Sequence, residues 1–286
     1  MNAAPHAHAY YVPQPSLYPF ILSGGMFLLA VGSILLMNEF RAGPWVIVGG
    51  AGVIVYVLFG WFGRVIGESQ GGSYGAWEDK SFRYGMVWFI ASEVMFFAAF
   101  FGALFYVRVI SVPELGQMEL AHGVTLWPGF AGTWPSAGPK GAAFTPMAAW
   151  GIPAINTALL LSSGATVTWA HWGLLQNRRR QLSLGLAATV LLGIVFLILQ
   201  AYEYHHAYTE MGLTLGAGAY GATFFMLTGF HGFHVTLGAI MLSVILTRTL
   251  RGHFTADRHF GFEGVAWYWH FVDVVWLLLF VVVYWL

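Results

Sequence analysis

A single carboxylate, Glu93, lies in the middle of the apolar stretch FIASEVMFF, residues 89–97. On a helix, its own face is shared by Phe89, Ile90, Phe96 and Phe97. A charged carboxylate at the centre of a bilayer costs roughly 2.5 to 3.5 kcal/mol or more. Because no Lys, Arg or His occupies this face, we expect Glu93 to be protonated at neutral pH. Two roles remain open: a proton-active carboxyl beside a water-filled path, or a protonated carboxyl that hydrogen-bonds a neighbouring helix.

Two pairs of potential metal ligands stand three residues apart in other apolar stretches. They are His231 and His234 in TGFHGFH, and His270 and Asp273 in AWYWHFVDVVW. This spacing places both side chains on one helical face, so a two-ligand metal site is geometrically possible. Neither stretch supplies a third ligand, and the chain contains no cysteine. We therefore predict no metal site and no catalytic residue, and interpret these four residues as a structural network of interhelical hydrogen bonds.

The composition indicates that these residues lie in a membrane. Of the 286 residues, 58% are hydrophobic and only 8% are charged, whereas soluble domains carry about 25% charged residues. The formal net charge is zero, which gives no reason to expect a nucleic-acid partner. The chain is therefore predicted to be an integral membrane protein.

Seven apolar stretches are long enough to cross a bilayer, which requires about 20 residues each. They lie near residues 16–37, 45–62, 84–107, 155–174, 182–201, 220–246 and 266–286. An N-terminal tail (1–15) precedes them, and the segments between them include a polar loop (63–83) and a long loop rich in Pro and Gly (109–151). We predict an all-α membrane protein with seven transmembrane helices.

The distribution of Lys and Arg predicts the orientation of these helices. The loops after the second, fourth and sixth stretches carry Arg64, Lys80, Arg83, Arg178, Arg179, Arg180, Arg248, Arg251 and Arg258. The connections on the other side carry only Arg41, Arg108 and Lys140. By the positive-inside rule, the N-terminus lies in the cytoplasm and the C-terminus outside. Arg83 and Arg248 then stand at the inner interface, where they could bind lipid phosphates or act only in setting the topology.

Five stretches of the chain resemble subunit III of the cytochrome c oxidases, in the haem–copper oxidase family. They are RYGMVWFIASEVMFF (83–97), NTALLLSSGATVTWAH (156–171), LQAYEYHHA (199–207), YGATFFMLTGFHGFHV (220–235) and HFTADRHFGFEGVAWYWHFVDVVWLLLF (253–280). The first two apolar stretches match loosely, through GWFGRVIGES (60–69), and the outer loop after the third has no clear match.

The resemblance implies a particular arrangement of the seven helices. A two-helix bundle (16–62) and a five-helix bundle (84–286) would enclose a V-shaped cleft that holds phospholipids. Glu93 matches the intramembrane glutamate of that family. The positions that match its lipid contacts are Glu68, Phe89, Arg248 and one or both of Trp61 and Phe62, and Arg83 joins them as a candidate by its location.

The resemblance also implies an accessory role in a proton-pumping, aa3-type cytochrome c oxidase. The redox centres, haem a, haem a3 and copper, would lie in subunits I and II, and cytochrome c would donate electrons to the complex. This chain would bind no cofactor; it would stabilise subunit I, bind phospholipid and support proton uptake into the D pathway. Its predicted location is the bacterial inner membrane.

Two alternative functions remain to be weighed. A subunit of a related quinol oxidase is disfavoured by the seven stretches, where five would be expected, and by the full C-terminal motif. A standalone transporter would show inverted repeats and helices broken near the midplane. No repeat is evident in this sequence, and the third and seventh stretches read as uninterrupted.

Overall fold

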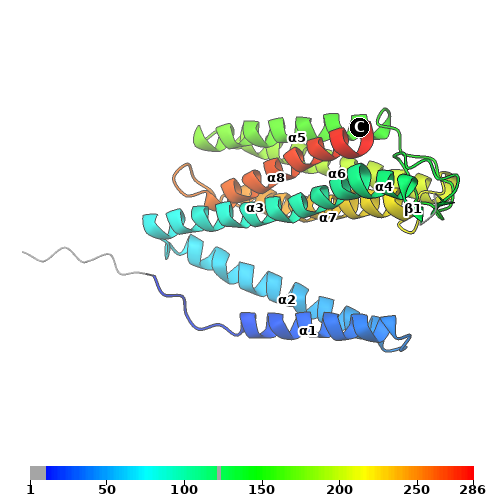
Figure 1. The fold of residues 1–286 in the computed structure, drawn as a ribbon. Coiled ribbons are helices and arrows are strands. Elements are labelled where there is room, and N and C mark those ends of the chain that lie inside the picture. Colours follow the sequence, from blue (N-terminus) through cyan, green and yellow to red (C-terminus); the bar gives the residue numbers. More distant parts are fainter. Residues whose placement is uncertain (1–10, 121–123) are drawn as a thin grey trace, which may run out of the picture. The chain divides into compact units, whose positions relative to one another are not determined.

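The computed structural model describes residues 11–120 and 124–286, which are mostly helical (Figure 1). Within these residues, the long helices are α1 (Tyr18–Met37), α2 (Gly43–Gln70), α3 (Ala76–Phe105), α5 (Ile152–Leu175), α6 (Arg179–Glu210), α7 (Gly218–Leu250) and α8 (Phe260–Leu279). A π-helical segment, Tyr106–Ser111, and α4 (Val112–Gln117) continue α3, and a second π-helical segment, Phe280–Trp285, continues α8. The short strands β1 (Glu119–Leu120) and β2 (Val124–Thr125) pair in antiparallel register.

The predicted all-α membrane fold is confirmed. Each predicted span lies largely in one long helix, and six helices of the described residues are long and apolar enough to cross a membrane. The helices extend beyond several predicted spans: α3 begins at Ala76 and α6 continues to Glu210. An apolar window detects only the segment that suits hydrocarbon, whereas a helix can continue into the polar interface. For the same reason, only residues 71–75 of the predicted 63–83 loop connect α2 to α3.

The chain divides into two compact units, one ending at Phe82 and the other running from Arg83 to Leu286. In the first unit, α1 and α2 form a helical hairpin with glycines at the contact. A methyl group added at Gly32 would lie 2.7 Å from the backbone nitrogen of Ile47. Such small residues allow two helix backbones to approach closely in a membrane.

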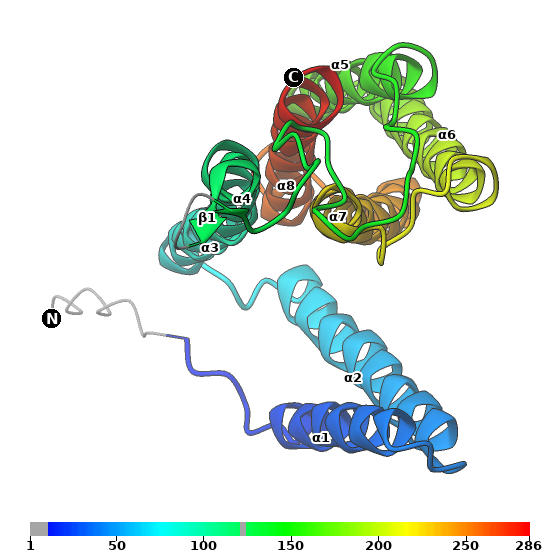
Figure 2. The ribbon, with the colours of Figure 1, turned by 45° about the vertical axis from the view of Figure 1, so that its right-hand side comes forward.

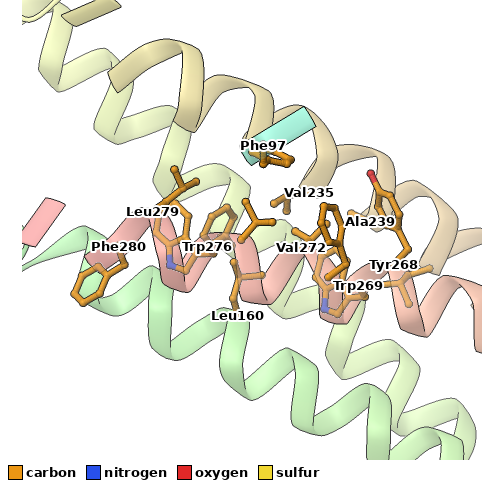
Figure 3. Packing of buried hydrophobic residues seen from close by; sticks show 14 of the residues in the cluster. Phe97, Leu160, Val235, Ala239, Tyr268, Trp269, Val272, Trp276, Leu279 and Phe280 are labelled. Atoms are coloured by element: carbon orange, nitrogen blue, oxygen red, sulfur yellow. The ribbon is translucent and has the colours of Figure 1, made fainter. Parts of the chain in front are cut away.

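In the second unit, α5, α6, α7 and α8 follow one another around a ring, which Figure 2 shows nearly end-on. Large aromatic side chains from α8 fill its interior, as the close view of the core shows (Figure 3). Trp269 and Trp276 are both almost completely buried. Helix α3 joins this group through aromatic contacts, such as Phe96 against Phe230 and Phe89 against Tyr268.

Among the long helices of the second unit that the structure describes, α5 is the one whose side chains are not apolar enough for a typical membrane span. Its polar side chains form hydrogen bonds to neighbouring helices. These pairs are Ser163 with Trp269 (2.8 Å), Thr157 with Trp276 (2.9 Å), Thr166 with Thr189 (2.8 Å) and Asn156 with Gln200 (3.4 Å). Helix α5 is thus held in place by polar contacts inside the bundle, where they replace contacts with lipid.

Candidate functional site

Glu93 on α3 forms a hydrogen-bonded pair with His234 on α7. Its Oε2 lies 2.9 Å from Nε2 of the imidazole, and the other ring nitrogen, Nδ1, lies 2.6 Å from the carbonyl oxygen of Phe230. The side chains are 21% and 8% exposed, respectively. The imidazole is surrounded by aromatic rings, including Phe97 at 5.0 Å between centroids. The pair therefore lies in a largely apolar environment at the contact between α3 and α7.

The carbonyl of Phe230 limits the protonation states that the Glu93–His234 pair can adopt. A carbonyl oxygen can only accept, so Nδ1 of His234 must donate to it. The hydrogen bond to Glu93 then has two forms. Either a protonated Glu93 donates to the lone pair of a neutral His234, or a doubly protonated His234 donates to a carboxylate. In both forms, the two side chains together hold one exchangeable proton.

The partner of Glu93 lies on a neighbouring helix and was not identified from the sequence. Glu93 has no cation on its own helical face, as predicted, but the structure gives it a partner on another helix. Asp273, which sequence analysis favoured in a structural network, is not the group that Glu93 contacts; Asp273 faces His270 instead, with 3.9 Å between Oδ2 and Nδ1. Reasoning from one helical face cannot identify a partner that is 141 residues away in the chain.

The four residues interpreted as one polar network belong to separate contacts. His231 is buried, and its Nε2 donates to the carbonyl of Val272 at 3.2 Å. His234 faces Glu93, while His270 and Asp273 lie together between α5 and α8. Among the residues that the structure describes, no three His, Asp or Glu side chains are close enough to hold a metal ion.

Sequence analysis missed another buried carboxyl, that of Glu203. The predicted span ended at Ala201, but α6 continues past it and buries Glu203 within the bundle. Its Oε1 accepts hydrogen bonds from the hydroxyl of Tyr284 (2.7 Å) and from Nε2 of Gln200 (3.3 Å). The spacing of Gln200 and Glu203 on one helical face was the available signal for a polar contact at this position.

The basic lipid-binding candidates of the second unit differ in their partners. Arg83 forms an ion pair with Glu263, which neutralises much of its charge. The guanidinium of Arg248 lies 4.5 Å from the ring centre of Phe254, and its Nε is buried with no hydrogen-bond partner in the described chain. Arg248 is therefore the better placed of the two to bind an additional anion.

The remaining lipid-binding candidates are mostly aromatic or already hydrogen-bonded. Trp61 stacks on Tyr18, Phe62 is exposed, and Phe89 stacks on Tyr268. Glu68 accepts hydrogen bonds from Nε of Arg64 (3.3 Å) and from the hydroxyl of Tyr74 (2.7 Å).

The Tyr74 hydroxyl lies in the connection between α2 and α3. Burial, together with the hydrogen bond to the Glu68 carboxylate, raises its pKa. This tyrosine therefore remains a hydrogen-bond donor to Glu68 across the physiological pH range.

The fold and the site define an all-helical integral membrane protein whose interior holds protonatable side chains on several helices. The family model for cytochrome c oxidase subunit III matches residues 8–286, and the chain belongs to this family. It is 42% identical over 279 residues to cytochrome c oxidase subunit 3 of Marchantia polymorpha, covering 97% of this chain and 96% of the relative.

Similar proteins from animals match to the same extent. Cytochrome c oxidase subunit 3 of Danio rerio is 42% identical over 283 residues, covering 99% of this chain and 98% of the relative. The protein of the same name from Oryctolagus cuniculus is 40% identical over 279 residues, covering 97% of each chain. The similarity therefore extends over both helical units.

Proposed function

We propose that this chain is an accessory subunit of a proton-pumping, aa3-type cytochrome c oxidase. The observation that supports this most strongly is the family match over residues 8–286. In this proposal, haem a, haem a3 and copper are bound by subunits I and II, and cytochrome c supplies the electrons. This chain then acts without a redox centre, by stabilising subunit I and supporting proton uptake into its D pathway.

The exposed apolar face of α3 supports a contact with subunit I. Trp88 is 75% exposed and Met95 is 69% exposed, and their spacing of seven residues places them on one face of this helix. Large exposed apolar side chains in a membrane protein can contact lipid or another protein, and aromatic and Met side chains are enriched at protein interfaces. We propose that this face packs on subunit I.

The proposed location is a bacterial inner membrane, with the N-terminus in the cytoplasm. The excess of Lys and Arg around the ends of α2, α5 and α7 and the starts of α3, α6 and α8 supports this orientation. The polar residues between α2 and the start of α3 then lie on the side from which protons are taken up.

Deletion of this chain should leave an oxidase that still reduces oxygen but loses activity during turnover. The reason is that electron transfer needs haem and copper, whereas the proposed contribution of this chain is support of subunit I. Oxygen consumption would be followed over time at several pH values, with and without the chain. We expect the deleted complex to inactivate several-fold faster and to lose initial rate most at high pH, where surface charge matters more for gathering protons.

Three measurements separate this proposal from its alternatives. Complete loss of initial activity at low pH, with subunits I and II assembled and fully metallated, would mean that the chain takes part in the chemistry. A chain that purifies alone and colourless in mild detergent would favour a standalone transporter. A complex that oxidises quinol but not cytochrome c would favour a quinol oxidase.

We further propose that Arg248 binds the head group of a structural phospholipid. Replacement of Arg248 with Ala should reduce the phospholipid that copurifies with the complex and should release this chain more readily in detergent. The matched control is Arg251→Ala, which removes an exposed arginine one turn further along the chain. Equal lipid content and equal retention in the two variants would remove Arg248 from the lipid site.

A further inference from the structure

A row of polar side chains lines the contact between α5 and α8. It begins at the end of the bundle where α5 and α7 end and α6 and α8 begin, called here the basic end. The arginines at this end are Arg83, which pairs with Glu263 in the first turn of α8, and Arg178, Arg179, Arg180, Arg248, Arg251 and Arg258. The row ends at the buried carboxyl of Asp273.

The first part of the row lies at the basic end itself. His259, just before α8, has its Nε2 3.9 Å from Oε2 of Glu263. The ring of His171, near the end of α5, lies 5.5 Å from that of His259 between centroids. Nε2 of His171 is buried and has no hydrogen-bond partner among the described residues. Three titratable side chains thus stand next to one another at the entrance to the helix contact.

The second part of the row lies deeper and ends at Asp273. The hydroxyl of Thr168 is 3.3 Å from Nε2 of His270, and Nδ1 of His270 is 3.9 Å from Oδ2 of Asp273. A methyl group added at Gly164 would lie only 2.4 Å from this same Oδ2, so the carboxyl fits against α5 only because position 164 is glycine. The other carboxyl oxygen, Oδ1, is buried without a partner in the described part of the chain.

The hydrogen bonds of Thr168 determine the tautomer of His270. Thr168 uses its own hydrogen on the carbonyl of Gly164, at 2.9 Å, so its oxygen accepts from Nε2 of His270. In the neutral imidazole, Nδ1 then carries the lone pair that faces Asp273. The carboxyl therefore lies beside a group that can take up and return its proton.

The two parts of the row are close enough to exchange protons. Thr168 and His171 share one face of α5 and are separated by about 4.5 Å along the helix axis, a gap that one or two water molecules can bridge. The side chain of His270 is 45% exposed, so the deeper part of the row is open at the surface of the described chain.

We propose that Asp273 is a proton-binding site that exchanges its proton with the aqueous phase at the basic end, through His270, Thr168 and His171. In each exchange, the Asp273 carboxylate takes one proton from hydronium and releases water, and the reverse step ionises it again. The described structure gives Asp273 no Lys or Arg ion pair, so the neutral form removes a charge that would otherwise be buried and uncompensated.

The other titratable groups near Asp273 have partners of their own. On α8, Glu263 pairs with Arg83, and on α7, His231 donates to the carbonyl of Val272. The Glu93–His234 pair is a separate site at the contact of α3 with α7. The proton-binding role of Asp273 is also independent of the proposed supportive function, because neither requires the other.

The test is infrared spectroscopy of the whole oxidase complex after transfer from H₂O to D₂O. We expect a protonated-carboxyl band that is lost in Asp273→Asn and that shifts in D₂O. The variants Thr168→Val and His270→Phe should retain the band but slow its shift on the order of tenfold. The matched control is Thr157→Val, which removes a hydroxyl of the same helix that bonds Trp276 and lies outside the row.

Several outcomes would overturn the proposal. One is an unchanged set of carboxyl bands in Asp273→Asn. Another is a shift rate in Thr168→Val and His270→Phe that equals the wild-type rate, or an equal slowing in Thr157→Val. If Asp273→Asn does not assemble, aspartate-specific carbon-13 labelling of this chain, reassembled with unlabelled partner subunits, replaces it. The band must then shift with the label, and its absence among labelled bands would contradict the proposal.

Discussion

Replacement of Trp269 with Ala should lower the free energy of unfolding of the helical bundle by about 3 to 5 kcal/mol. Trp269 is completely buried and contacts three other helices. Its ring would lie 2.8 Å from a methyl group added at Gly193 on α6, and 2.7 Å from one added at Gly238 on α7. Its Nε1 donates to the hydroxyl of Ser163 on α5, at 2.8 Å. The loss combines the transfer of a large apolar surface with a cavity that rigid helices cannot close.

The stability of wild type and variant would be compared by denaturant titration of the purified chain or complex in mixed micelles. Ser163→Ala removes the hydrogen bond and keeps the ring, so it should cost only about 1 kcal/mol. Trp285→Ala is the control for tryptophan loss as such, because Trp285 is 59% exposed. A Trp269→Ala loss no larger than that of Trp285→Ala would show that Trp269 does not hold the four helices together.

The helices could be predicted because a membrane selects apolar segments of a minimum length. That signal found all seven long helices of the described chain, including α5, whose Ser and Thr residues reduce its apolarity. It failed at helix ends, where α6 continues beyond the predicted apolar segment and includes Glu203. Ends depend on local polar contacts, which hydropathy does not record.

The contacts of the candidate site were less predictable than its residues. Glu93 was identified from the cost of a carboxylate in hydrocarbon, which is a local property. Its partner His234 depends on how α3 packs against α7, which the sequence of α3 alone does not record. In the same way, the need for glycine at position 164 could not be predicted, because it depends on α8 placing Asp273 against it.

The Glu93–His234 pair leads to a prediction about where its proton resides. In a largely apolar environment, two neutral groups are favoured over two separated charges, so we expect protonated Glu93 to donate to neutral His234. Glu93→Gln should then lose a protonated-carboxyl band in the infrared spectrum. It should cost little stability, because the amide N–H of Gln can still donate to Nε2 of His234.

A double-mutant cycle distinguishes the neutral pair from an ion pair. His234→Leu and Glu93→Leu each leave one polar group without its partner, at an expected cost of about 1 to 3 kcal/mol. The double variant should recover most of this loss, since replacing both partners by apolar groups can be nearly neutral. An ion pair would instead make Glu93→Gln as costly as breaking a buried salt bridge, about 3 to 5 kcal/mol, and the wild type would show a carboxylate band. Because the carbonyl of Phe230 fixes Nδ1 of His234 as a donor, these two forms account for both ways of placing the proton between Glu93 and Nε2.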